Sequence, residues 1–134
     1  MWGTMGFIGG KKMDEEIRKK DEIVQFLVDL EIEPRVEIGD IGLNLIFSDG
    51  DINLALDRLT IDEKWVIDRY DKVMDELNKD VFDPIFEKVA KSEISGEPML
   101  FRLNTLIEME LNRLKNNTSL ELYIAELMLD VPDV

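Results

Sequence analysis

The segment Arg35–Asp57 has the most regular pattern of apolar residues in the chain. Apolar side chains occupy alternate positions on both sides of a polar Ser48–Asp51 sequence: Ile41, Leu43, Leu45 and Phe47 before it, and Ile52, Leu54 and Leu56 after it. Alternation with a period of two is the pattern of a β-strand that buries one face. An Asp-Gly pair between two such runs favours a hairpin, because a type I′ turn needs positive φ at both central residues.

A two-residue turn at Asp49-Gly50 would determine which residues face each other. The resulting pairs are all apolar: Phe47–Ile52, Leu45–Leu54 and Leu43–Leu56. A slip of one residue would break this match. Gly39-Asp40 can form a second turn of the same length, with the pairs Ile38–Ile41, Val36–Leu43 and Ile32–Phe47. Pro34 would then lie on an outer strand, where a missing N–H is tolerated. The pattern predicts a three-stranded antiparallel meander over about residues 32–57.

The same segment also permits a helical interpretation. Asp51 is a suitable N-cap residue, and four apolar residues after it would share one helical face: Ile52, Ala55, Leu56 and Leu59. The sequence GDINLALDRL, residues 50–59, resembles the last helix of UBA-like domains. In that comparison Ile23, Leu27 and Leu30 would lie on the first helix. The resemblance implies a helical protein-binding module.

The chain departs from the UBA-like pattern in two places. The loop after the first helix is longer, and Leu30-Glu31-Ile32 stands where the family has a Met-Gly-Phe-like element. Gly42 would also lie inside a short helix, at a cost of about 1 kcal/mol relative to alanine. These departures favour the meander over the helical interpretation.

The remainder of the chain has the apolar spacing of amphipathic helices. Predicted helices cover approximately Asp14–Leu30, Ile61–Lys79, Asp83–Ser92 and Met99–Lys115, and a last helix carries Leu120 to Met128. Thr60–Glu63 and Thr118–Glu121 have the form of capping boxes, and Asp83-Pro84 resembles an N-cap followed by proline. The expected fold class is α+β: an N-terminal helix, the meander, and about four helices packed on its apolar face. The alternative is an all-α fold with a UBA-like N-terminal half.

The length of 134 residues indicates one domain. We expect a single globular domain over residues 13–134, preceded by an apolar, glycine-rich arm over residues 1–12. Trp2, Phe7 and Ile8 in this arm are the candidate interface residues, because exposed aromatic side chains in a mobile tail lower solubility. The competing interpretation is a loose terminus.

The net charge of −14 bears on the choice of partner. Such a chain repels nucleic acid and anionic membranes, so neither direct nucleic-acid binding nor membrane association is expected. A protein partner is expected instead, and the basic surface of a nucleic-acid-binding protein is one option. The arm could also join copies of the chain into a homo-oligomer. Because there is no cysteine, we expect an intracellular, cytoplasmic protein.

No catalytic, cofactor-binding or metal site is predicted. Histidine, the commonest general base and metal ligand, is missing. Four residues resemble part of a calcium-binding loop: Asp49, Asp51, Asn53 and Asp57. The pattern fails where glycine and glutamate are required, because Leu54 and Thr60 occupy those positions. Turn formation is the simpler explanation for these polar residues.

The leading functional hypothesis is a non-enzymatic protein-interaction protein: an adaptor, an inhibitor or an assembly subunit. An inhibitor that presents carboxylates in place of phosphates would gather them on one face. Two alternatives come from other classes. One is an enzyme that uses a divalent metal held by carboxylates, and the other is an oligomeric structural subunit.

Overall fold

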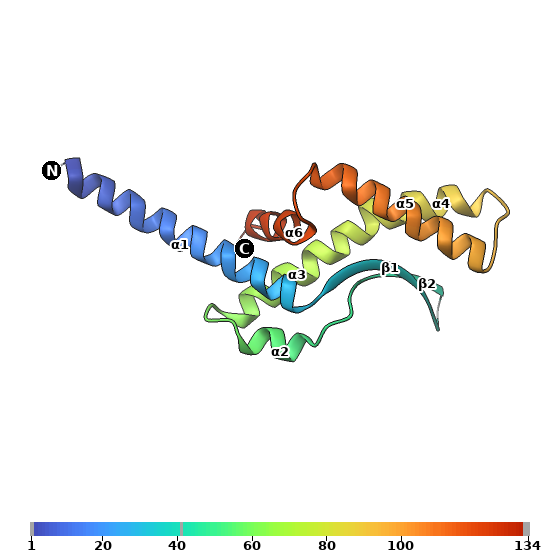
Figure 1. Cartoon of the computed structure of the whole chain (residues 1–134), viewed down its shortest axis with the longest axis horizontal. Helices are drawn as coiled ribbons and strands as arrows, with labels where there is room; N and C mark the ends of the chain where they lie inside the picture. Colours follow the sequence, from blue (N-terminus) through green and yellow to red (C-terminus); the bar gives the residue numbers. More distant parts are fainter. Residues whose placement is uncertain (1, 41, 133–134) are drawn as a thin grey trace.

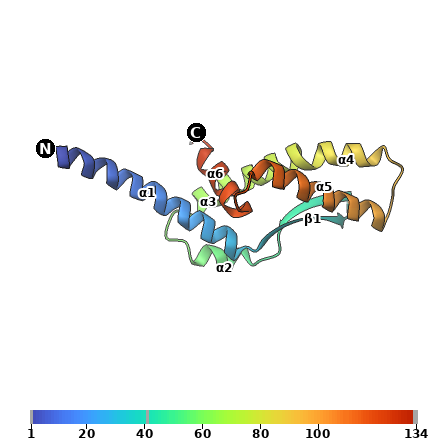
Figure 2. The ribbon, with the colours of Figure 1, turned by 45° about the horizontal axis from the view of Figure 1, so that its top comes forward.

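The structure is a computed structural model that describes residues 2–40 and 42–132, with side chains from Glu15 onward. The elements, in chain order, are α1 (Trp2–Asp29), β1 (Ile32–Gly39), β2 (Gly42–Ser48), α2 (Ile52–Asp57), α3 (Glu63–Leu77), the π-helical segment η1 (Asn78–Phe82), α4 (Asp83–Ala90), α5 (Glu97–Lys115) and α6 (Leu120–Asp130) (Figure 1). Helices α1, α3 and α6 pack together, whereas α5 packs against α4 and β1 (Figures 1 and 2).

The core joins most of these elements in one cluster of buried side chains. Its largest fully buried members are Phe26, Ile23, Leu27, Leu30, Leu103, Ile107, Ile124, Met128, Val66, Val81 and Val89. The hairpin adds Ile32, Val36, Leu45 and Phe47. The fold is therefore α+β in its broad form, as predicted, but the described residues contain a two-stranded hairpin and not a three-stranded meander.

The register of the hairpin differs from the predicted one by two residues. Val36 pairs with Leu45, Ile38 with Leu43, and Gly39 with Gly42. A shift of two leaves the same residues on each face, so the apolar pattern cannot distinguish the two registers. Gly42 has a φ of 131°, a conformation that favours glycine, and this requirement locates the start of β2. Ile41 lies outside the described residues.

The N-terminal end of β1 contains an irregularity around Pro34. Ile32 pairs with Ser48 and Arg35 pairs with Ile46, so β1 has one more residue than β2 over this interval. Glu33 and Pro34 are the residues in between. Proline donates no hydrogen bond to a ladder and is tolerated at bulges and on outer strands.

The predicted third strand is wrong, because Ile52–Asp57 forms helix α2. The Asp51 carboxylate caps this helix and accepts hydrogen bonds from the N–H groups of Asn53 (2.9 Å) and Leu54 (3.4 Å). Ala55 is the residue that α2 buries. The helical alternative is thus correct for this short segment. The all-α alternative is wrong, because Ile32–Gly39 and Gly42–Ser48 form strands.

Gly50 does not form the predicted hairpin turn. It lies where the backbone passes close to Leu30 at the end of α1. Its N–H donates to the carbonyl oxygen of Leu30 at 2.9 Å, and the Ser48 hydroxyl donates to the same oxygen at 2.9 Å. A Cβ atom on Gly50 would lie 2.4 Å from that oxygen and 2.6 Å from the carbonyl carbon. Glycine is therefore needed where the chain passes the end of α1.

Both predicted capping boxes are displaced from the observed caps. The N-cap of α3 is Asp62, whose side chain accepts from the N–H of Lys64, and the N-cap of α6 is Ser119, which accepts from Leu122. The Thr60 hydroxyl instead donates to the Glu22 carboxylate of α1 at 2.7 Å. A contact with a distant helix therefore takes the place of the predicted local cap.

Asp83 and Pro84 do not start an isolated helix, because α3 continues through η1 into α4. In a regular α-helix the ring of Pro84 would collide with the carbonyl group of Asp80, four residues earlier. The wider π-helical turn relieves this conflict, and the N–H of Asp83 donates to Asn78 five residues earlier. The turn carries Val81 and Phe82 into the core.

We predict that Gly50→Ala lowers the free energy of unfolding by about 2–3 kcal/mol, because the added methyl group meets backbone atoms of Leu30. Gly39→Ala is the matched control: its nearest new contact is the side-chain amide of exposed Asn44, which can rotate away. Its cost should be below about 1 kcal/mol. Urea denaturation followed by circular dichroism would measure both. Equal losses would contradict the proposed role of Gly50.

Candidate protein-interaction surfaces

The predicted N-terminal arm is continuous with the first helix. Helix α1 begins at Trp2 and not near Asp14, so no break in the helix separates residues 2–12 from the sequence that follows. The candidate interface residues Trp2, Phe7 and Ile8 belong to α1, but their side chains lie outside the described part of the structure. Their contribution to an interface therefore stays a prediction.

Helix α1 leaves the body of the protein at about Lys19. The described side chains before this point, residues 15–18, are all exposed, and Ile17 is 54% exposed. Figures 1 and 2 both show the N-terminal half of the helix projecting from the other elements. At a rise of about 1.5 Å per residue, the segment from Trp2 to Arg18 extends about 25 Å.

The base of this projection is held by polar and aromatic contacts. Lys19 Nζ lies 5.1 Å from the ring centroid of Trp65, and the guanidinium of Arg69 lies 4.0 Å from the same ring. Lys20 Nζ and Glu126 Oε1 are 3.0 Å apart. Arg69 Nη2 also donates to the carbonyl oxygen of Val131 at 3.2 Å. These contacts join α1, α3 and the end of α6, and they fix the direction in which α1 leaves the body.

The acidic residues around Gly50 have structural partners. The Arg35 guanidinium donates two hydrogen bonds to the Asp49 carboxylate, and Arg35 Nε lies 2.7 Å from Glu37 Oε1. Asp51 caps α2. Within the described residues, no group of three or more metal-ligating side chains is arranged to hold an ion. Two of the residues that resembled a calcium loop therefore have structural roles: Asp49 pairs with Arg35 of β1, and Asp51 caps α2.

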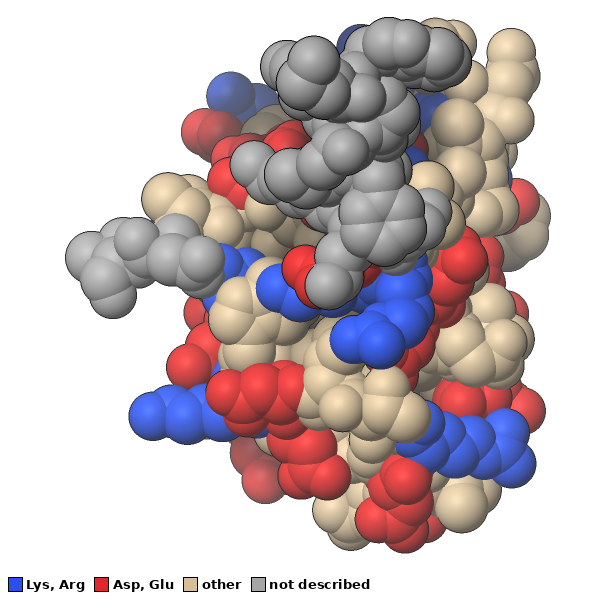
Figure 3. Space-filling view, turned by 90° about the vertical axis from the view of Figure 1, so that its left-hand side faces the viewer, with Lys and Arg blue, Asp and Glu red and all other residues tan. Residues whose placement is uncertain are grey.

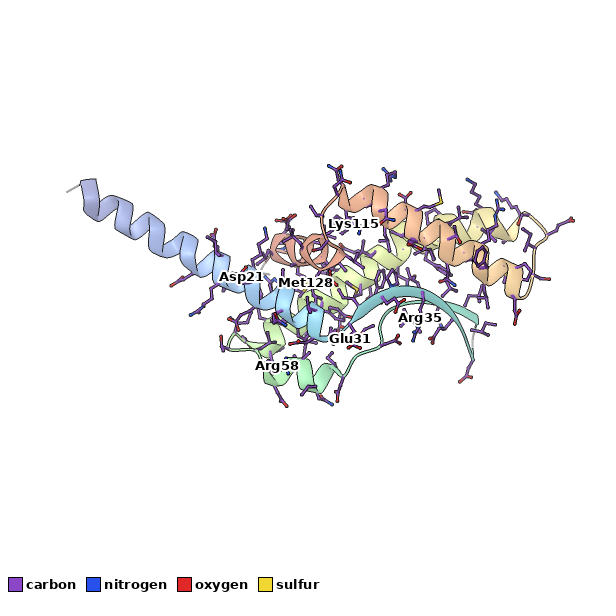
Figure 4. The ribbon with its side chains drawn as sticks, viewed as in Figure 1. Asp21, Glu31, Arg35, Arg58, Lys115 and Met128 are labelled. Atoms are coloured by element: carbon purple, nitrogen blue, oxygen red, sulfur yellow. The ribbon has the colours of Figure 1, made fainter. Side chains whose placement is uncertain are left out.

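Carboxylates are distributed over the whole described surface. Exposed Asp or Glu residues occur on each of the helices α1 to α6 and on β1. Figure 4 labels charged side chains along the chain, including Asp21 of α1, Arg58 after α2 and Lys115 of α5. In the view of Figure 3, Lys and Arg lie among Asp and Glu. This mixture gives no support to an inhibitor that gathers phosphate-like carboxylates on one face.

A groove of about 240 Å³ lies between β2 and α3. Its walls are Leu45, Ile46, Phe47 and Ser48 from β2, Tyr70, Met74 and Asp75 from α3, and Asn78 at the start of η1. The ring of Tyr70 packs edge-on against Phe26, with centroids 5.9 Å apart. Burial raises the pKa of the Tyr70 phenol, and the neighbouring charge of Asp71 adds to the shift. The groove is lined by both apolar and polar side chains, and the carboxylate among its lining residues is that of Asp75.

The opposite edge of the hairpin is covered by α5. Asn104 Oδ1 accepts a hydrogen bond from the N–H of Val36 at 2.8 Å, and its Nδ2 donates to the carbonyl oxygen of Leu100 at 2.9 Å. Sequence reasoning missed this contact. The sequence contains one indication of this contact: Asn104 is a polar residue beside the apolar stripe of α5, one turn after Leu100, and a partly buried polar side chain needs a hydrogen-bond partner.

Comparisons of the chain with protein-family models, curated proteins and solved structures found no match. Among the described residues, no helix is both long enough and apolar enough to cross a membrane.

We predict that Asn104→Ala lowers the free energy of unfolding by about 1–2 kcal/mol, because the partly buried N–H of Val36 loses its acceptor. Alanine has the higher helix propensity, so the loss cannot come from the helix itself. Asn112→Ala, at an exposed position of α5, is the matched control and should be neutral or slightly stabilising. Hydrogen exchange should also become faster at Val36. Equal stability of the two variants would show that the contact contributes nothing.

Proposed function

We propose that this chain is a non-enzymatic interaction protein, an adaptor, inhibitor or assembly subunit, that binds a protein partner through the N-terminal half of α1. The observation that carries the proposal is the projection of this helix from a body to which it is attached only from about Lys19 onward in its described side chains. A helix that leaves the body in this way offers its whole circumference to a partner.

The composition of the projecting segment supports binding. Gly3, Gly6, Gly9 and Gly10 lie within α1, and each costs about 1 kcal/mol relative to alanine in a helix. Short helices in water are marginal even with good helix formers. Packing of Trp2, Phe7 and Ile8 against a partner would offset this cost, because large apolar side chains contribute most of the energy at interfaces.

The charge of the chain favours a basic partner. A body with a net charge of −14 speeds the approach of a positively charged surface and slows that of another acidic protein. A second copy of the same chain is therefore the less favoured occupant. If the arm instead joins copies of this chain, the protein is an oligomeric structural subunit, and its mass in solution distinguishes the two cases.

Site-specific crosslinking would test the proposal. A photoreactive phenylalanine analogue at position 7 should capture a partner in extracts of the source cells, whereas the same analogue at Phe101 should not. Phe101 is the matched control because it is an aromatic residue of α5 that is 76% exposed. Combined alanine substitution of Trp2, Phe7 and Ile8 should abolish retention of the partner captured at position 7. Higher salt should weaken binding of the same partner to the unsubstituted chain.

Deletion of residues 2–12 provides the structural control. The body should keep its unfolding transition, because the described contacts of α1 begin at Lys19. Loss of partner retention with an unchanged transition would support the proposal. Partner retention by the deleted chain, or equal crosslinking from positions 7 and 101, would contradict it. If the full-length chain sediments as an oligomer while the deleted chain sediments as a monomer, residues 2–12 bind a second copy of the same chain and not another protein.

A further inference from the structure

The two edges of the hairpin differ in how their backbone groups are satisfied. In an antiparallel pair, directly opposite residues alternate between those bonded to each other and those whose N–H and C=O groups point outward. Val36 donates its N–H outward to Asn104, so Val36 and its partner Leu45 form an outward-pointing pair. The same alternation applies two residues away to Ile38 and Leu43.

The outer edge of β2 therefore presents the N–H and C=O groups of Leu43 and Leu45. No described residue outside the hairpin makes a hydrogen bond to these groups. The arrangement is the reverse of the β1 edge, where Asn104 covers Val36 and Pro34 has no N–H to offer. The β1 edge is therefore covered by α5 at Val36, whereas no described residue outside the hairpin covers Leu43 and Leu45 on the β2 edge.

The sequence of β2 lacks the features that keep strand edges from pairing. Natural edge strands carry charged residues or proline that oppose the addition of another strand. Residues 41–48 contain neither, although about a third of the chain is charged. By contrast, β1 carries Glu33, Arg35 and Glu37. The absence of protection on β2 is therefore a local property of this strand.

The groove beside β2 can receive side chains from an added strand. A new strand would lie about 4.8 Å from β2, with alternate side chains on opposite faces. On one face these side chains would reach the groove of about 240 Å³ that Tyr70 and Met74 line. This volume holds one or two aliphatic side chains. Pairing would combine backbone hydrogen bonds with an apolar anchor, as in known cases of strand addition.

We propose that β2 binds an extended, basic segment of a partner protein, which adds to the hairpin as a third strand beside Leu43 and Leu45. The charge of the site selects this occupant. Asp75 is the charged residue of the groove wall, and the chain as a whole carries −14. Lysine or arginine between the apolar residues of the segment would be attracted, whereas a second copy of this chain would be repelled. The inference concerns a different surface from α1 and does not depend on it.

Titration with synthetic peptides would test the proposal on the full chain. The probe is a heptapeptide that alternates lysine with valine, and the matched control replaces each lysine with glutamate. We expect the lysine peptide to bind at least about tenfold more tightly. Its binding should shift the amide signals of Leu43 and Leu45 and slow their hydrogen exchange. The amides of Asn44 and Ile46, which point toward β1, should already exchange slowly in the free protein.

Two substitutions separate the backbone contribution from the charge contribution. Leu43→Pro removes an outward N–H without removing a bond to β1, and should weaken lysine-peptide binding about tenfold or more. Asp75→Asn should weaken binding of the lysine peptide and raise that of the glutamate peptide. Glu87→Gln, an equal change of charge at an exposed position of α4, is the control and should change neither. The Asp75 comparison keeps the test decisive if Leu43→Pro does not fold.

Three outcomes would overturn the proposal. Equal affinity for the lysine and glutamate peptides would contradict the claim that the bound segment is basic. If the peptide shifts amide signals outside β2, or does not bind, β2 is not the binding site. Dimerisation of the free chain that Leu43→Pro abolishes would assign the edge to a second copy. Deletion of residues 2–12 should leave peptide binding intact, so failure at β2 is distinguishable from failure of the α1 proposal.

Discussion

The carbonyl group of Leu30 connects the three parts of the N-terminal half. The last carbonyls of a helix have no partner within the helix. At the end of α1, the oxygen of Leu30 accepts from both the Ser48 hydroxyl and the Gly50 N–H. This contact closes the hairpin against α1 and delivers Asp51 directly to the start of α2. Helix α2 then packs back on α1, where Arg58 Nη1 lies 3.3 Å from Asp29 Oδ1. One carbonyl group therefore positions the hairpin and α2 together.

The hairpin in turn depends on α5 for its place in the fold. A two-stranded hairpin alone is marginal in water and needs a further element to cover it. Val36, Leu45 and Phe47 supply the apolar contribution by entering the core, and Asn104 supplies a polar contact at the β1 edge. Helix α5 covers the β1 edge, so β2 forms the uncovered edge of the two-stranded sheet. The asymmetry follows from the position of α5, which packs against β1, whereas a groove separates β2 from α3.

The successes and failures of sequence reasoning have definite physical causes. Alternation correctly indicated the strands Ile32–Gly39 and Gly42–Ser48, because Val36, Leu45 and Phe47 face the core. It could not determine the register, because a shift of two residues preserves the faces. It also predicted a strand at Ile52–Leu56, where the decisive contacts are the Asp51 cap and the approach of Gly50 to Leu30. The second of these is tertiary and has no signal in a short stretch of sequence.

The candidate surfaces were predictable to different degrees. The apolar composition of residues 1–12 pointed to Trp2, Phe7 and Ile8, although nothing in that composition indicated a helix that begins at Trp2. The open edge of β2 could not be predicted, because it depends on the register and on Asn104, more than fifty residues later in the chain. The acidic residues near Gly50 drew attention as a metal loop because Asp is common both in turns and in ion sites.

The distribution of uncharged sequence connects the two surfaces. Charged residues make up 34% of the chain, yet residues 1–10 and 41–48 contain none. Charge on a contact surface must be removed from water when a partner binds, and this desolvation opposes association unless a matching charge is present. Stretches without charge avoid that cost, while the acidic body around them still selects which partner approaches. Under the two proposals, the acidic surface and the uncharged stretches would act at different stages: long-range attraction by the body would come first, followed by short-range contact through α1 or β2.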